Sequence, residues 1–314
     1  MLVRPSRVTW VISVLSGGVG AARLLRALQR HRPDVELSAV VNVADDVTMH
    51  GLTICPDLDT ITYTVAGLNN AEAGWGLAGE TWRVMEELER LGGLTWFRLG
   101  DRDLATHLYR TQRLGDGATK SEVARELAAR HGLRIELLPV SDDPVATVLE
   151  TEVGRLSFQE YFVAHRHDVV VREVLYEGAP DARLGLGAER ALRDAERVVI
   201  APSNPILSVG PILAIGPVRD VLAERRDDVV AVSPIINGAA LKGPADRLLG
   251  EMGLPVSVLG VAQYYAGLIG TLVIDEADAH LAESVRDLGI NCVVSTTVLA
   301  NEDNARRLCE VLVP

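Results

Sequence analysis

The chain has 314 residues, of which 48% are hydrophobic and 24% charged, and its formal net charge is −12 at pH 7. This length and composition are typical of a globular protein with one large or two modest domains. The acidic balance and an aromatic content of 4% argue against a nucleic-acid partner, because phosphate backbones are bound through lysine and arginine and single strands through stacked aromatic rings.

Short apolar runs rich in β-branched residues alternate with segments of helical periodicity along most of the chain. This alternation predicts an α/β fold, a mostly parallel sheet with helices on both faces. In chain order, the predicted strands are residues 8–15, 36–43, 95–100, 197–205, 227–235, 270–277 and 290–298. The predicted helices between and after them are residues 21–31, 80–92, 104–112, 278–289 and 301–312.

The pattern changes between about residues 120 and 180. A predicted helix at residues 121–132 leads to β-rich runs at 134–143, 145–163 and 168–176, with a Gly-Arg turn that indicates antiparallel strands. We predict a smaller α+β subdomain inserted at about residues 120–180. No repeat, low-complexity tract or linker marks a boundary, so residues 1–314 are interpreted as a single domain.

The first apolar run resembles a secretion signal only superficially. Arg4 and Arg7 precede it, but glycines and a basic helical segment follow at once, so we interpret it as a buried first strand. No apolar run reaches the length of a membrane span, and we expect no membrane partner. Three scattered cysteines, Cys55, Cys292 and Cys309, suit neither a disulfide framework nor a zinc site and favour a cytoplasmic location.

A cluster of aspartates follows the second predicted strand. Within residues 33–82, which contain no lysine or arginine, it comprises Asp45, Asp46, Asp57 and Asp59. Open α/β sheets bind their ligands at the carboxyl ends of strands, and a divalent metal is the natural counter-charge for grouped carboxylates. The structural alternative is two solvated turns, because aspartate favours loops through local hydrogen bonds.

The turn after the first predicted strand is rich in glycine. Gly17, Gly18 and Gly20 would let the backbone approach a ligand closely, and the following helix N-terminus favours an anion. The spacing matches neither the dinucleotide-binding fingerprint nor a Walker A loop. A tight structural turn therefore remains the alternative interpretation.

Three further polar loops follow predicted strands. In residues 99–112, Asp101 or Asp103 should lie near a helix N-cap, with Arg102 projecting from the loop and His107 facing either solvent or a neighbouring carboxylate. The second of these loops, residues 201–215, offers Ser203 and Asn204 as hydrogen-bonding groups, and the third offers Lys242 as a phosphate contact. Five polar loops at predicted strand ends are more than a purely structural sheet needs.

Together these motifs resemble the 2-phospho-L-lactate transferase family of coenzyme F420 biosynthesis. The resemblance runs from about residue 15 to the C-terminus. It rests on SGGVGAARLL, VNVADD, ICPDLDT, GDRDLATHLYRT, LPVSDDPVATVLET, FQEYFV, PSNPILSVGPILAI, VSPIINGAALKGPADRLL and GVAQYY. The chain departs from the family pattern at Ala21 and at Ile236-Asn237-Gly238, which affects only the fine geometry of the phosphate loops.

The resemblance implies a Rossmann-like core and a magnesium-dependent transferase. In this reaction the ribityl hydroxyl of the deazaflavin Fo attacks a guanosine diphosphate adduct of a three-carbon acid, and GMP leaves. The acid is phosphoenolpyruvate, phospholactate or 3-phosphoglycerate; no motif distinguishes them, although bacterial members are commonly phosphoenolpyruvate transferases. Family analogy also implies a homodimer.

The resemblance also implies roles for particular residues. Asp45 or Asp46 would bind Mg²⁺ together with Asp59, and one of these carboxylates, Asp45 or Asp59, would be the base, with Asp57 the fourth acid of the group. Asp59 and Arg102 fall in motifs that face Fo. The implied diphosphate contacts are Gly17, Gly18 and Gly20, and the implied guanosine and phosphate contacts are Ser203, Asn204 and Lys242.

Two other functions remain open at this stage. One is a non-enzymatic regulator of the same fold that binds a nucleotide sugar; GDRDLATH and PSNPILSVGPI favour the transferase over it. The other is a nicotinamide-dependent dehydrogenase, which would require the third glycine of the dinucleotide fingerprint.

Overall fold

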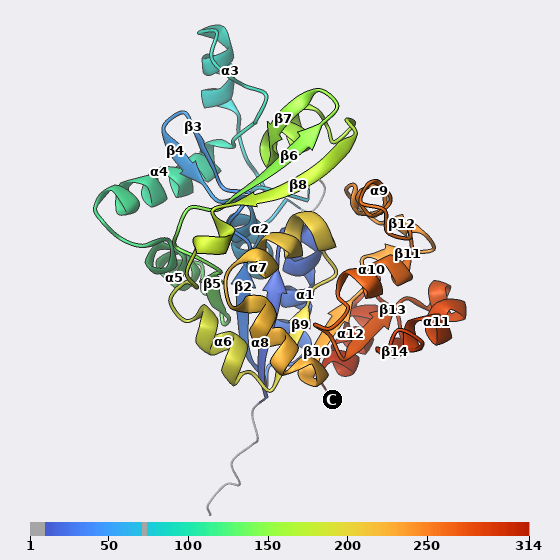
Figure 1. Ribbon diagram of the computed structural model, residues 1–314. Helices are drawn as coiled ribbons and strands as arrows, with labels where there is room; N and C mark the ends of the chain where they lie inside the picture. The colour runs from blue at the N-terminus through green and yellow to red at the C-terminus, as the bar shows by residue number, and fades with distance from the viewer. Residues whose placement is uncertain (1–9, 71–73, 314) are drawn as a thin grey trace, which may run out of the picture.

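A seven-stranded parallel sheet forms the centre of the computed structural model, which describes residues 10–70 and 74–313 (Figure 1). Each neighbouring pair of strands runs in parallel, which confirms the predicted α/β class. In spatial order the strands are β14 (Asn291–Val294), β13 (Thr271–Ile274), β10 (Val229–Val232), β9 (Arg197–Ile200), β1 (Val11–Ser16), β2 (Glu36–Val41) and β5 (Glu136–Pro139).

Helices cover both faces of this sheet. On one face lie α1 (Gly18–His31), α2 (Pro56–Val65), α5 (Lys120–Arg130) and α12 (Glu302–Leu312). On the other face lie α6 (Ala188–Asp194), α7 (Gly210–Ala214), α8 (Val218–Glu224), α9 (Ala245–Glu251), α10 (Val258–Tyr264) and α11 (Ala282–Arg286). The short 3-10 and π-helical segments are η1 (Glu160–Ala164), η2 (Ala179–Asp181), η3 (Pro205–Val209), η4 (Arg226–Asp228) and η5 (Glu276–Leu281).

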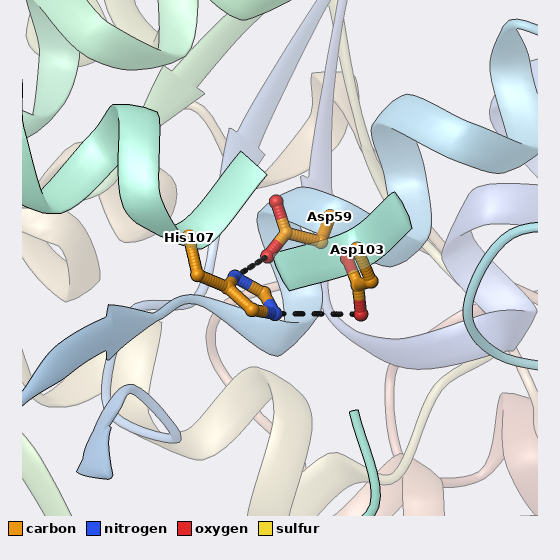
Figure 2. Close-up of side chains that lie close together, drawn as sticks. All are labelled: Asp59, Asp103 and His107. Atoms are coloured by element: carbon orange, nitrogen blue, oxygen red, sulfur yellow. Dashed lines mark ion pairs between the residues drawn. The ribbon is translucent and has the colours of Figure 1, made fainter. Parts of the chain in front are cut away.

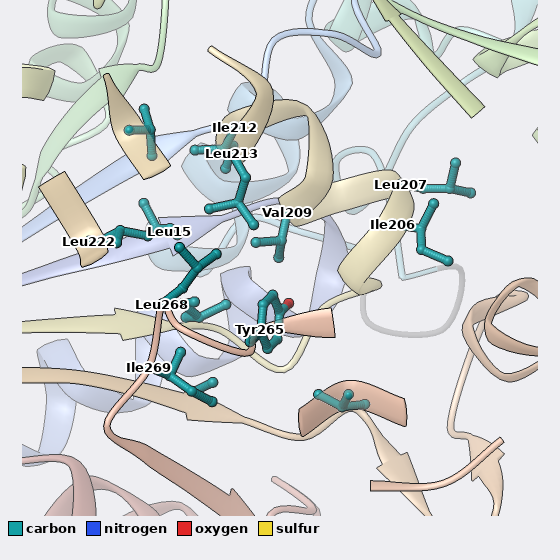
Figure 3. Close-up of a cluster of buried hydrophobic side chains, with 14 of the residues drawn as sticks. Leu15, Ile206, Leu207, Val209, Ile212, Leu213, Leu222, Tyr265, Leu268 and Ile269 are labelled. Carbon is teal, nitrogen blue, oxygen red and sulfur yellow. The ribbon is translucent and has the colours of Figure 1, made fainter. Parts of the chain in front are cut away.

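The central strands are buried because each packs against helices on both sides. In β1, Ile12 and Val14 point into the core with α1, whereas Leu15 points into the opposite core. Figure 3 shows Leu15 beside Val209, Leu213 and other apolar side chains of that second core. Burial on both faces explains why these strands appear in the sequence as continuous apolar runs.

Residues 146–177 form a separate antiparallel sheet, as their sequence pattern predicts. Its strands are β7 (Gly154–Ser157), β6 (Ala146–Thr151) and β8 (Val171–Glu177), in that order. The two elements that precede it belong to the central sheet instead. Strand β5 pairs with β2, and α5 packs on one face of that sheet. The proposed division into one domain with an insertion at about residues 120–180 stays a prediction.

The predicted strand at residues 95–100 is wrong. These residues form a loop between α3 (Arg83–Arg90) and α4 (Asp101–Gly115). Their apolar side chains instead join a small third core with the hairpin of β3 (Val47–Met49) and β4 (Leu52–Ile54). In Figure 1 this region lies above the central sheet, with α3 as its outermost element.

One more antiparallel hairpin, β11 (Ile235–Ile236) with β12 (Ala239–Ala240), follows β10.

In the described part of the chain, no helix by itself has the length and hydropathy needed to cross a bilayer. The segments Pro205–Ala214 and Val218–Glu224 meet those criteria only as a pair, and the pair is bent by 94°.

Candidate active site

One cavity of about 870 Å³ lies at the carboxyl ends of the central strands. Strand β1 pairs with β2 on one side and with β9 on the other, so the chain order reverses beside β1. Open α/β sheets bind ligands at such a reversal. The predicted site residues that line the cavity are Gly17, Gly18, Gly20, Asp45, Asp57, Asp59, Ser203, Asn204 and Lys242.

Two predicted site residues are not among those that line this cavity. The carboxylate of Asp46 instead pairs with the ammonium group of Lys120 at 2.7 Å. The guanidinium of Arg102 donates to the backbone oxygen of Ala78, and the Arg102 backbone N–H donates to Glu80. Both side chains thus contact neighbouring groups of the protein, and their proposed roles toward a metal and Fo stay predictions.

The glycine turn is tied to both neighbouring loops. Gly18 has a φ of 68°, a left-handed conformation that glycine adopts without strain. Its backbone N–H donates to Asp57 at 2.7 Å, and the hydroxyl of Ser203 donates to the backbone oxygen of Gly17 at 2.6 Å. Part of the helix N-terminus that we assigned to an anionic ligand is thus already occupied by the carboxylate of Asp57.

Asp45 and Asp57 form a buried carboxylate pair. Burial raises the pKa of Asp45 well above its ordinary value, and the charge of Asp57 raises it further. Burial also raises the pKa of Asp57 to about 6, although hydrogen bonds from Gly18 and from Asn42, the latter at 3.0 Å, oppose the rise. A proton or a cation bound close by would therefore stabilise this pair of acids.

A second buried group of charges surrounds Asp59 (Figure 2). The Nδ1 atom of His107 lies 3.7 Å from Oδ2 of Asp59, and its Nε2 atom lies 3.4 Å from Oδ2 of Asp103. The hydroxyl of Tyr63 donates to Oδ1 of Asp103 at 2.6 Å. Arg110 forms an ion pair with Oδ1 of Asp59, so these five side chains form one network.

The two carboxylates of this network differ in acidity. Burial raises the pKa of Asp59, and the charges of Arg110 and His107 oppose that rise. Burial acts on the pKa of Asp103 in the same direction. The hydrogen bonds of His107 and Tyr63 and the charges of His107 and Arg110 together outweigh burial, so the pKa of Asp103 is lowered. Asp103 is consequently the more firmly ionised of the pair.

Sequence reasoning missed Tyr63, Arg110 and the cavity-facing role of Asp103. Asp103, His107 and Arg110 follow one another at intervals of four and three residues, which places them on one face of α4. That spacing is the signal that would have identified them. His107 itself lies between carboxylates, one of the two environments predicted for it, and only 1% of it is exposed.

The cavity offers oxygen atoms that fit a hard divalent cation. Oδ1 of Asp45 and Oδ2 of Asp59 are buried, and neither accepts a hydrogen bond from the described residues. Ligand atoms of Asp59, Asp103 and His107 also lie within 4.8 Å of one another. Carboxylate oxygens are the ligands that Mg²⁺ prefers. Among the described residues, Asp45 and Asp46 do not belong to the group formed with Asp59, so their predicted roles as metal ligands stay predictions.

Aromatic rings also line the cavity. Trp75, Trp96, Phe97, Phe158 and Phe162 contribute to its wall. The rings of Phe158 and Phe162 are stacked, with centroids 5.4 Å apart. One cavity therefore combines a carboxylate-rich region with an aromatic region suited to a planar ring system.

Comparison with known proteins decides the family. Residues 12–308 match the sequence profile described as 2-phospho-L-lactate transferase CofD. The chain belongs to this family. The resemblance predicted from the sequence motifs is confirmed, and the chain is a transferase.

Members of the CofD family with curated descriptions are similar over almost their whole length. The phosphoenolpyruvate transferase of Streptomyces griseus is 41% identical, over 96% of this chain and 98% of the relative. The 2-phospho-L-lactate transferase of Methanosarcina mazei is 36% identical, with the same two coverages of 96% and 98%.

A solved structure confirms the fold more broadly. A crystal structure of a Bacillus halodurans protein superposes with a TM-score of 0.65, covers 98% of this chain and 100% of its own, and is 18% identical. At that identity the similarity concerns the fold alone. The family assignment, by contrast, favours the transferase over the regulator and the dehydrogenase.

Proposed function

We propose that this CofD-family transferase moves a phospho-three-carbon-acid group from a guanosine diphosphate adduct to the ribityl hydroxyl of the deazaflavin Fo, with release of GMP. The observation that carries the proposal is the composition of the 870 Å³ cavity, in which buried carboxylates lie beside aromatic rings. The carboxylates suit phosphoryl transfer, and the rings suit a deazaflavin. The names of the curated relatives support the three-carbon acid.

The proposed step is a displacement at phosphorus. The ribityl oxygen forms a bond to the phosphorus that carries the acid, and the bond from that phosphorus to the oxygen of GMP breaks. The hydroxyl proton passes to a carboxylate, for which Asp45 and Asp59 are the candidates lining the cavity. When bound, Mg²⁺ would supply positive charge to the phosphate oxygens.

The turn after β9 is suited to recognise the nucleotide. The side-chain oxygen of Asn204 accepts from the backbone N–H groups of Ile206 and Leu207 at 2.9 and 3.1 Å, which orients its amide nitrogen as a donor. The Ser203 hydroxyl donates its proton to the backbone oxygen of Gly17, so the Ser203 oxygen can only accept a hydrogen bond from a ligand. This pair of donor and acceptor supports the proposed guanosine contact.

Lys242 supports a phosphate contact at the cavity wall. It follows β12 and lines the cavity together with Gly243. Its Nζ atom lies 3.2 Å from the position that a Cβ would occupy on Gly74. The ammonium group therefore lies at the cavity wall, where it balances the charge of a diphosphate.

For the acid we propose phosphoenolpyruvate. Relatives described as phosphoenolpyruvate transferases, such as those of Streptomyces avermitilis and Streptomyces coelicolor, are 42% and 39% identical. The Methanosarcina mazei relative described as a phospholactate transferase is 36% identical. An assay of all three adducts with Fo separates these acids by their kcat/KM values.

Binding of Fo, followed by its fluorescence, tests the proposed function. We expect a Kd in the micromolar range and tighter binding when magnesium and GDP are present. Asp59→Asn should leave the fold intact and lower turnover by about two orders of magnitude or more, because a contact made in the transition state is lost. Absence of Fo binding, or near-wild-type turnover by folded Asp59→Asn, would contradict the proposal.

A further inference from the structure

Arg110 lies behind the wall of the cavity rather than in it. Only 2% of Arg110 is exposed, and it is not among the residues that line the cavity. It lies on the same face of α4 as Asp103 and His107, and 51 residues along the chain separate it from Asp59, with which it forms an ion pair. A buried cation is thus placed against a single carboxylate of the site.

The remaining contacts hold the guanidinium in a fixed position. Its Nη1 atom donates to the backbone oxygen of Thr53 at 3.3 Å and lies 3.2 Å from Nδ1 of His107. Nε2 of the same imidazole ring lies 3.4 Å from Oδ2 of Asp103.

These contacts leave the two oxygens of Asp59 in different environments. Oδ1 is bound by Arg110. Oδ2 is buried, makes no hydrogen bond with the described residues, and lies on the side of His107, which lines the cavity. A carboxylate bound through one oxygen cannot rotate freely, so the other oxygen keeps its direction.

We propose that Arg110 is a positioning residue of the transfer reaction, which acts through Asp59 by holding Oδ1 from behind the cavity wall and keeping Oδ2 available to the reacting groups. The inference rests on the proposed function and deepens it. The alternative is a purely structural ion pair, which would affect folding stability but not the reaction of the folded protein. The two possibilities differ in how Arg110 and Asp59 depend on each other.

A double-mutant cycle measures this dependence. The variants are Arg110→Met, Asp59→Asn, the double variant, and Arg110→Lys, which retains the charge but not the planar fork. Arg113→Met is the matched control, since Arg113 follows on the same helix and pairs with the partly exposed Glu126 at 2.9 Å. The readouts are kcat and KM for Fo, Fo binding by fluorescence, and Tm.

If Arg110 acts through Asp59, Arg110→Met should lower kcat about 10- to 100-fold with less than about a threefold change in KM for Fo or in Fo binding. In the Asp59→Asn background, the same change should alter kcat by less than about threefold. Arg110→Lys should be intermediate, and Arg113→Met should match the wild type.

The Tm values test whether the ion pair forms in the folded protein, and the kcat values test whether it acts in the reaction. Arg110→Met leaves a buried charge without a partner, so it should lower Tm more in the wild type than in Asp59→Asn. Equal losses of kcat in both backgrounds, an unchanged kcat in folded Arg110→Met, or a rise in KM equal to the fall in kcat would overturn the proposal. If Arg110→Met does not fold, wild-type kcat in Arg110→Lys would overturn it equally.

Failure of the proposed function gives a different result. In that case the wild-type protein transfers nothing to Fo, whichever acid the adduct carries. The Tm cycle needs no substrate and still reports whether Arg110 and Asp59 are coupled.

Discussion

Asp57 connects three parts of the site at the scale of a single residue. It accepts hydrogen bonds from Gly18 of the glycine turn and from Asn42 after β2, and it lies beside Asp45. The structure shows it lining the cavity while also capping α1, so its charge state affects both stability and the site.

Protonation of Asp57 should make the protein more stable at mildly acidic pH. Its pKa is raised from 3.8 to about 6, chiefly by burial. The folded form thus binds the proton more tightly than the unfolded form, so this contribution is complete below about pH 4 and is lost as the pH rises through 6. A shift of about two pKa units corresponds to at most about 3 kcal/mol.

Urea unfolding of the wild type and of Asp57→Asn between pH 4 and 7 measures this effect. We expect the decrease in unfolding free energy over that range to be smaller in the variant, whatever its absolute stability. Asp227→Asn is the control, because the Asp227 side chain is 93% exposed. The same pH dependence in wild type and Asp57→Asn would exclude this role for Asp57.

At the scale of elements, the site depends on close contact between α1 and the loop after β9. A Cβ on Gly20 would lie 2.2 Å from the backbone oxygen of Pro202. Neither backbone can give way without moving the glycine turn or the loop that carries Ser203 and Asn204. Glycine is therefore needed at position 20 for close packing rather than for an unusual φ.

Gly20→Ala should destabilise the protein by about 1–3 kcal/mol and weaken GDP binding, because the two loops can no longer meet. Thermal unfolding and GDP titration measure both effects. Gly115→Ala is the matched control at the end of α4, where a Cβ meets no atom within 4 Å, and it should be neutral or slightly stabilising. A Gly20→Ala variant as stable as that control would show that the loops adapt.

At the scale of the whole molecule, the cores differ greatly in size. Extensive apolar clusters pack on the two faces of the central sheet, whereas the third core contains four buried apolar residues, Met49, Ile54, Met85 and Leu99. Segments with few buried contacts open at lower free energy.

The homodimer implied by the family resemblance also belongs to the scale of the whole molecule, and it stays a prediction.

Amide hydrogen exchange should therefore be at least about tenfold faster in α3 than in β1. Trp96 and Phe97 belong to both the third core and the cavity wall, so Fo should slow exchange in residues 82–99. The edge strand β14 serves as the internal control and should not change. Exchange in α3 as slow as in β1 would contradict this distribution of stability.

The sequence alone determined the parallel sheet and the position of most polar loops. Apolar runs such as those of β1 and β9 are local signals, and the chain itself attaches a loop to the end of each strand. The same logic failed at residues 95–100, because a short apolar run looks the same whether it enters a sheet or packs a small core. Motifs of sufficient length also determined the family.

Only the tertiary structure decided which polar side chains meet. Asp45 and Asp46 are adjacent in sequence, yet Asp45 lines the cavity and Asp46 pairs with Lys120. Arg110 reaches Asp59 because α4 brings residues 51 positions apart into contact. Such pairings depend on how helices pack over long sequence separations, and local sequence patterns carry no information about that packing.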